Sequence, residues 1–317
     1  MTIHLSQIKE PTESASTVEK FKAQKTLYSV MLVVLFSCAG IALPYPVLAP
    51  IFLNEISPLT TFADLPGKIS LGIILAIYPL GVILGSSVLG AASGLYGRKR
   101  TLLITLVLTI IGYVLSALAV VAESFLMLIF ARFITGIFSG NISIAKAIAV
   151  DLSPTLDKTH TFNLVNATGY IGWLLGPLAG GLLAVYGLDA VFYLAAIALV
   201  IALLSVTFFL QADASELNQS NVKFSQLFSK QNSFALLANT KIRRIFLIYL
   251  LATLGLNAYY EFYPVWLVEN FNFTSLNIGY ITVVLTLCMT ITSVFFVKKL
   301  KLIMGLKFGA IFGMVLM

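Results

Sequence analysis

Eight long apolar runs divide the sequence, and each is long enough to cross a lipid bilayer. They cover residues 27–53, 69–89, 101–121, 125–150, 164–185, 190–210, 245–268 and 278–297. A transmembrane helix needs about 20 mostly apolar residues to span a hydrocarbon core of ~30 Å. The runs therefore predict an all-α membrane protein with eight full transmembrane helices, since a helix satisfies its backbone hydrogen bonds internally.

A ninth apolar run covers residues 303–317, at the end of the sequence. At ~1.5 Å per residue it reaches about 22 Å, which is short of the hydrocarbon core. We therefore expect the chain to be truncated within its ninth helix. Only 10% of the residues are charged, against roughly 25% in soluble domains, so lipid must cover much of the surface.

The basic residues indicate the orientation of the chain in the membrane. With the N-terminus in the cytoplasm, seventeen of the 20 lysines and arginines fall in cytoplasmic segments, and only Lys68 falls on the other side. Cytoplasmic segments carry an excess of lysine and arginine. We therefore predict a multi-pass membrane protein with a cytoplasmic N-terminus. The net charge is +7. Because the basic residues lie between apolar runs and set the orientation, this charge does not indicate a nucleic-acid partner.

The spacing of the runs predicts two unequal halves. A polar tail (1–26) precedes an N-terminal six-helix half (27–210), a long basic linker (211–244) follows it, and an incomplete C-terminal half (245–317) closes the sequence. Six helices, a cytoplasmic linker and then more helices are typical of transporters built from two repeated halves.

The sequence shows no arrangement of residues typical of soluble enzymes or metal sites. Cys38 and Cys288 lie in apolar runs far apart, which indicates no disulfide. His4 and His160, the two histidines, lie outside the runs, and no phosphate-binding loop or nucleophile motif is visible. We expect no enzyme activity, no cofactor and no metal.

The loop between the second and third runs carries the first specific motif, 90-GAASGLYGRKR-100. It resembles the loop signature of the major facilitator superfamily, G-x-x-x-D-x-x-G-R-K/R, at Gly90, Gly97, Arg98 and Lys99. Gly94 stands in place of the aspartate, which in the family helps to lock the cytoplasmic gate. The resemblance implies a gate at this loop.

The resemblance also implies an ion pair between Arg98 and Asp151, the residue that follows the fourth run.

Glycines at spacings of three and four mark one face of the fifth run. Such a face is common wherever two membrane helices pack closely. The pattern also resembles the antiporter signature of drug–proton antiporters in the same superfamily, which implies export. The matching residues are Gly172, Gly176, Pro177, Gly180 and Gly181.

Of the charged residues within the apolar runs, two are candidates for proton coupling. Arg132 matches the superfamily's R-x-x-x-G motif with Gly136, where the arginine is thought to assist proton transfer; alternatively it only pairs with polar groups inside the bundle. Glu261 lies among aromatic residues and could carry a proton; alternatively it sits in an interfacial aromatic belt.

Four further residues are candidates for substrate contact, from helix positions that line the central cavity in the family. They are Tyr45, Asn257, Tyr260 and Tyr263.

The resemblance covers roughly residues 27–297 and implies a drug–proton antiporter similar to bacterial tetracycline and multidrug exporters. It implies a monomer in the bacterial inner membrane, with a small molecule, protons and the lipid bilayer as partners. Two alternatives stay open: an uptake symporter of the same fold, and a truncated remnant that does not transport.

Overall fold

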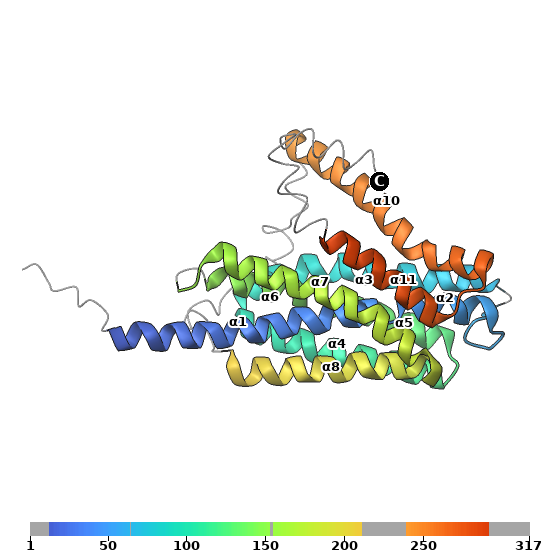
Figure 1. The fold of residues 1–317 in the computed structure, drawn as a ribbon, viewed down its shortest axis with the longest axis horizontal. Coiled ribbons are helices and arrows are strands. Elements are labelled where there is room, and N and C mark those ends of the chain that lie inside the picture. Colours follow the sequence, from blue (N-terminus) through green and yellow to red (C-terminus); the bar gives the residue numbers. More distant parts are fainter. Residues whose placement is uncertain (1–12, 64, 153–154, 211–238, 292–317) are drawn as a thin grey trace, which may run out of the picture.

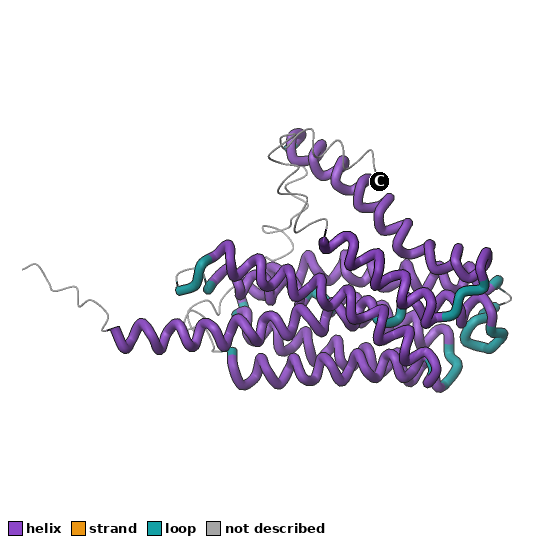
Figure 2. The backbone as a smooth tube through the Cα atoms, in the orientation of Figure 1, coloured by secondary structure: helices purple, strands orange, loops and turns teal. Residues whose placement is uncertain are grey.

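The computed structural model describes residues 13–63, 65–152, 155–210 and 239–291, and every regular element in these ranges is helical. The helices are α1 (Glu13–Ala42), α2 (Tyr45–Asn54), α3 (Gly67–Leu95), α4 (Arg98–Val121), α5 (Phe125–Phe138), α6 (Asn141–Asp151), α7 (Lys158–Leu183), the 3-10 turn η1 (Ala184–Tyr186), α8 (Leu188–Phe209), α10 (Thr240–Phe271) and α11 (Ser275–Ile291). In Figure 2, the described residues that lie outside the helices are loops and turns, drawn in teal.

Six stretches of the described chain are long and apolar enough to cross a membrane. They are Val18–Asn54, Gly67–Leu95, Arg98–Val121, Phe125–Asp151, His160–Tyr186 and Leu188–Phe209. They coincide with the first six predicted runs and make the chain a multi-pass membrane protein. The finer count of eight full helices and part of a ninth stays a prediction, since run 303–317 lies outside the described residues.

Helix α1 begins inside the segment that was expected to be a polar tail. It starts at Glu13, and residues 13–26 continue without a break into the apolar run. No glycine or proline occurs between Glu13 and Gly40, so nothing in the sequence interrupts helical hydrogen bonding.

Two of the spans are broken, each by a different cause. The first span divides between α1 and α2 at Pro44, which precedes the first residue of α2 and lacks an N–H for a helical hydrogen bond. The fourth divides between α5 and α6 at Ser139 and Gly140. There, the Thr109 hydroxyl of α4 donates to the Phe138 carbonyl at 3.0 Å, so the freed backbone oxygen is satisfied within the bundle.

The first six spans form one bundle of roughly parallel helices (Figure 1). Helix α1 lies at its centre and packs against α6, α7 and α8, while α4 packs against α5 and α8. Helix α11 lies against α7, and α10 meets the bundle at α2 and leans away from it toward its N-terminal end. We call the end where α3 begins the Lys68 end, and the opposite one the Arg98 end.

Close backbone contact at glycines holds α3 against α5. A Cβ atom built on Gly85 would lie 1.8 Å from the Ile137 carbonyl oxygen, and one on Gly81 would lie 2.5 Å from that of Phe133. Small residues allow membrane helices to approach this closely. A larger residue at either position would push the two helices apart.

We expect Gly85→Ala to lower the thermal stability of the purified protein, because the added methyl group has no room beside Ile137. Overpacking of this kind costs about 1–3 kcal/mol. Gly72→Ala is the matched control on the same helix, since nothing lies within 4 Å of its Cβ position. The fraction that stays monodisperse after heating measures the difference, and equal stability of the two variants would contradict this packing.

Candidate functional site

Tyr45 and Glu261 meet where α2 of the first half faces α10 of the second. The Tyr45 hydroxyl donates a hydrogen bond of 2.8 Å to Oε1 of Glu261, although 216 residues separate them. The Tyr45 ring stacks on Trp173 of α7, with ring centroids 6.3 Å apart. Oε2 of Glu261 is buried and has no hydrogen-bond partner among the described residues. A carboxylate is thus held between the two halves by a single directed contact.

Arg132 lies inside the first half, behind Tyr45. Its side chain is only 5% exposed, and its guanidinium carbon lies 4.5 Å from the Tyr78 ring centre and 5.7 Å from that of Phe192. Its Nε and Nη1 atoms have no hydrogen-bond partner in the described part of the chain. The aromatic faces therefore stabilise this charge in place of a carboxylate.

Arg132 and Glu261 interact electrostatically without forming an ion pair among the described residues. Tyr45, Tyr78, Pro44 and Arg132 surround a space that has no room for a water molecule. The two proton-coupling candidates are thus brought to the same region, with Tyr45 between them and no room for water beside Arg132.

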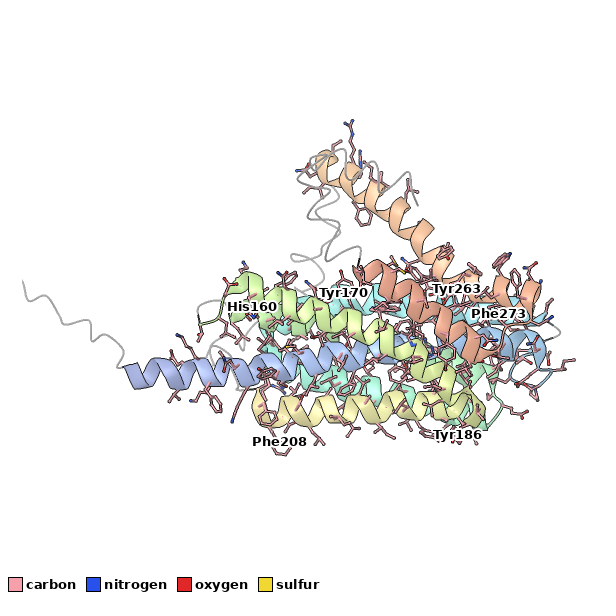
Figure 3. The ribbon with its side chains drawn as sticks, viewed as in Figure 1. His160, Tyr170, Tyr186, Phe208, Tyr263 and Phe273 are labelled. Carbon is pink, nitrogen blue, oxygen red and sulfur yellow. The ribbon has the colours of Figure 1, made fainter. Side chains whose placement is uncertain are left out.

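The other predicted substrate residues on α10 lie in different surroundings. Tyr263 shares a hydrogen bond with Thr282 of α11, and Tyr260 donates a hydrogen bond to Sδ of Met289, which also lies on α11. Figure 3 shows Tyr263 beside the crossing of α10 and α11. Asn257 is exposed, one turn before Glu261.

An apolar groove of about 390 Å³ lies between α10 and α11. It is lined by Tyr259, Phe262, Tyr263, Trp266, Leu267, Ile281 and Leu285. These aromatic residues of α10 thus lie toward this groove, whereas Glu261 of the same helix contacts α2.

At the Arg98 end, Arg98 and Asp151 form a two-point ion pair. The distances are 2.5 Å from Nε to Oδ2 and 3.0 Å from Nη2 to Oδ1. The contact implied by the family resemblance is therefore present, while its role as a gate stays a prediction.

The other motif residues of this loop have different surroundings. Lys99 donates hydrogen bonds to the carbonyl oxygens of Thr207 and Leu210. Leu210 directly follows the last residue of α8. Nothing lies within 4 Å of a Cβ atom built on Gly90 or Gly94, so the position of the family's aspartate is open space in the described structure.

The glycines predicted as an antiporter motif pack α7 on two sides. Cβ atoms built on Gly172, Gly176 and Gly180 would lie 2.5, 2.7 and 2.0 Å from carbonyl oxygens of α1 and the residue that follows it. On the other side, a Cβ on Gly279 of α11 would lie 2.8 Å from the Pro177 carbonyl oxygen. The motif is thus a packing face for α1 and a contact between the halves; its role in antiport stays a prediction.

Trp173, Tyr78 and Tyr113 complete the site and were not predicted as functional residues. Tyr78 donates a hydrogen bond of 2.9 Å to Ser139, at the break of the fourth span. Trp173 lies within the glycine motif, and its aromatic character inside a small-residue face was the one available signal. The partners of Tyr78 and Tyr113 come from other helices, so no local pattern identifies them.

Comparison with known families decides the assignment. The family model for the Major Facilitator Superfamily matches residues 30–317. The chain belongs to this superfamily. Membership supports the expectation that it is not an enzyme.

Superfamily relatives include tetracycline resistance proteins. The class H protein of Pasteurella multocida is 29% identical over 193 residues, which cover 61% of this chain and 46% of the relative. The class C protein of Escherichia coli is 33% identical over 177 residues, which cover 56% of this chain and 42% of the relative. The matched part of the chain spans less than half the length of these relatives.

Solved structures of transporters share the fold. The human organic anion transporter MFSD10 (TETRAN) superposes with a TM-score of 0.66 at 21% identity, over 86% of this chain and 72% of that one. A mutant of the nucleoside transporter NupG superposes with a TM-score of 0.65 at 12% identity, over 88% of this chain and 69% of that one.

We expect Arg98 and Asp151 to be energetically coupled. Arg98→Gln and Asp151→Asn should each lower thermal stability, and the double variant should lose less than the sum of the two. Half-exposed pairs contribute about 0.2–1 kcal/mol, and the two-point geometry favours the upper part of that range. Thermal unfolding of the four proteins in a double-mutant cycle measures the coupling, and strictly additive losses would show that the pair contributes nothing.

Proposed function

We propose that the chain is a secondary transporter that exports small molecules in exchange for protons by alternating access. The contact between Tyr45 and Glu261 is the observation that carries the proposal. Ionisable side chains within membrane proteins are costly and mark ion pathways or substrate sites. A carboxylate at the junction of the two halves can link the binding of a proton to the rocking of one half against the other.

Export rather than uptake is supported by the glycine motif of α7 and by the names of the relatives. Tetracycline is therefore the first compound to test, because two relatives are tetracycline resistance proteins. In this proposal Arg132 tunes the charge of Glu261 from within the first half. Asn257, Tyr260 and Tyr263 remain candidates for substrate contact.

We also propose where the protein lies and how it is oriented in the membrane. The protein is a monomer in a bacterial inner membrane with its N-terminus in the cytoplasm, so that the Arg98 end faces the cytoplasm. The ion pair of Arg98 and Asp151 would then close the cytoplasmic side when the Lys68 end opens.

Transport in everted membrane vesicles tests both activity and direction. The chain is expressed in a drug-sensitive host, and the interior of its everted vesicles is acidified. An exporter accumulates labelled tetracycline in these vesicles, and collapse of the pH gradient abolishes the accumulation. A proton symporter instead drives substrate out of these vesicles and accumulates it in intact cells. No gradient-dependent movement of any compound in a panel, despite membrane insertion, would contradict transport.

We expect Glu261→Gln to abolish proton-driven accumulation while leaving downhill exchange of the same substrate in place. The amide keeps the size of the side chain and cannot exchange a proton. Glu55→Gln is the control, because Glu55 is an exposed acid at the Lys68 end. Proton-driven accumulation that survives in Glu261→Gln would exclude Glu261 as the proton carrier.

A further inference from the structure

Among the described residues, Tyr45 and Lys68 of the first six spans make polar contacts with α10, and both contacts lie toward the Lys68 end. Tyr45 donates to Glu261 at 2.8 Å. Lys68 at the start of α3 pairs with Glu269 at 2.5 Å. Glu261 and Glu269 are eight residues apart, about 12 Å along a helix, so the two contacts follow one another from the bundle interior to its surface.

Helix α10 leans away from the bundle toward Thr240 (Figure 1), and Phe246, Leu247 and Ile248 are exposed. In the described part of the chain, α10 is therefore held to the first half at the Lys68 end and diverges from it toward the Arg98 end. The contacts at the Lys68 end are those that must break before this end can open.

The two contacts differ in how much they can contribute. Lys68 and Glu269 have side chains 66% and 36% exposed, and exposed pairs of this kind contribute little. The bond from Tyr45 is more shielded from water and runs to a carboxylate, and hydrogen bonds to ionised groups are roughly twice as strong as neutral ones. The inner contact therefore dominates the closure.

The strength of the inner contact depends on the charge of Glu261. Of the titratable and charged groups on the neighbouring helices α2, α5 and α11, only Tyr45 and Arg132 act on Glu261 in the described structure. Burial opposes a charge on Glu261, whereas both neighbours favour the ionised carboxylate, Tyr45 by donating to it and Arg132 by its positive charge. Oε2 accepts no hydrogen bond from the described residues and is therefore the carboxylate oxygen available to take a proton.

We propose that Tyr45 is a positioning residue that latches the Lys68 end shut through an ionised Glu261. A proton added to Oε2 converts the carboxylate to a neutral carboxyl group, which weakens the bond from Tyr45, removes the attraction to Arg132 and releases the latch. Stacking on Trp173 fixes the direction of the Tyr45 hydroxyl. The inference rests on the proposed function in taking Glu261 as the group that exchanges protons.

The latch is tested by measuring the distance between the halves at the Lys68 end. Spin labels are attached at Ile56→Cys, in an exposed loop, and at Asn270→Cys, at the exposed end of α10. The background carries Cys38→Ala and Cys288→Ser, and the full chain is reconstituted in nanodiscs. Electron–electron double resonance then gives the distribution of distances in alkaline and acidic buffer.

In alkaline buffer we expect the otherwise unchanged protein to give the short distance, and acidification to shift it toward longer ones. Tyr45→Phe should already populate the longer distances in alkaline buffer, with the ratio of closed to open forms lowered about tenfold, as for a lost hydrogen bond to a charged group. Its distances should no longer respond to acid. Glu261→Gln should match Tyr45→Phe, and combining the two should add nothing.

Tyr186→Phe is the matched control, because this exposed tyrosine lies at the Lys68 end on the side away from α10 (Figure 3). It should behave as the unchanged protein does. The proposal is overturned if Tyr45→Phe keeps the short distance in alkaline buffer, or if its distances still respond to acid. A pH-dependent distance in a protein that moves no substrate would uphold the latch and reject transport, so the two failures are distinguishable.

Discussion

Backbone contact at glycines is the interaction on which the rest of this structure depends. Between helices in lipid the hydrophobic effect gives little drive to associate, and close van der Waals packing takes its place. Helix α7 provides two such surfaces. The backbone of α1 and of the residue that follows it packs against Gly172, Gly176 and Gly180. Pro177 and Gly181 lie close to Gly279 of α11. The same helix thus anchors the first half and carries its contact with the second.

The polar groups lie where this packing leaves places for them. Arg132 lies against the rings of Tyr78 and Phe192, which both belong to the first half. Glu261 depends on Tyr45, which belongs to the opposite half. The surroundings of a charge that is stabilised within one half stay the same when the halves move. The surroundings of a charge that is stabilised across the junction must change. In the proposed mechanism, Glu261 is therefore the residue that links the motion of the halves to a change of charge.

Apolar run length predicted the first six spans, because the need to satisfy backbone groups in lipid leaves helices as the solution. The glycine spacing of α7 likewise predicted a packing face. The break at Ser139 and Gly140 was not predicted, since it depends on Thr109 and Tyr78 from other helices. Tyr45 was predicted to contact substrate. Its bond to Glu261 also depends on a distant helix, so it is visible only once the halves are placed together.

The contacts between the halves are of two kinds, and their difference bears on how the halves can move. Where α7 meets α11, Gly181 and Gly279 bring backbone against backbone, and a smooth surface of this kind permits small rotations without breaking a directed bond. Where α2 meets α10, the bond from Tyr45 to Glu261 has one donor, one acceptor and one geometry. A rotation of one half about the glycine contact therefore costs the most free energy at the bond from Tyr45. A change in the charge of Glu261 has its largest effect on this same bond.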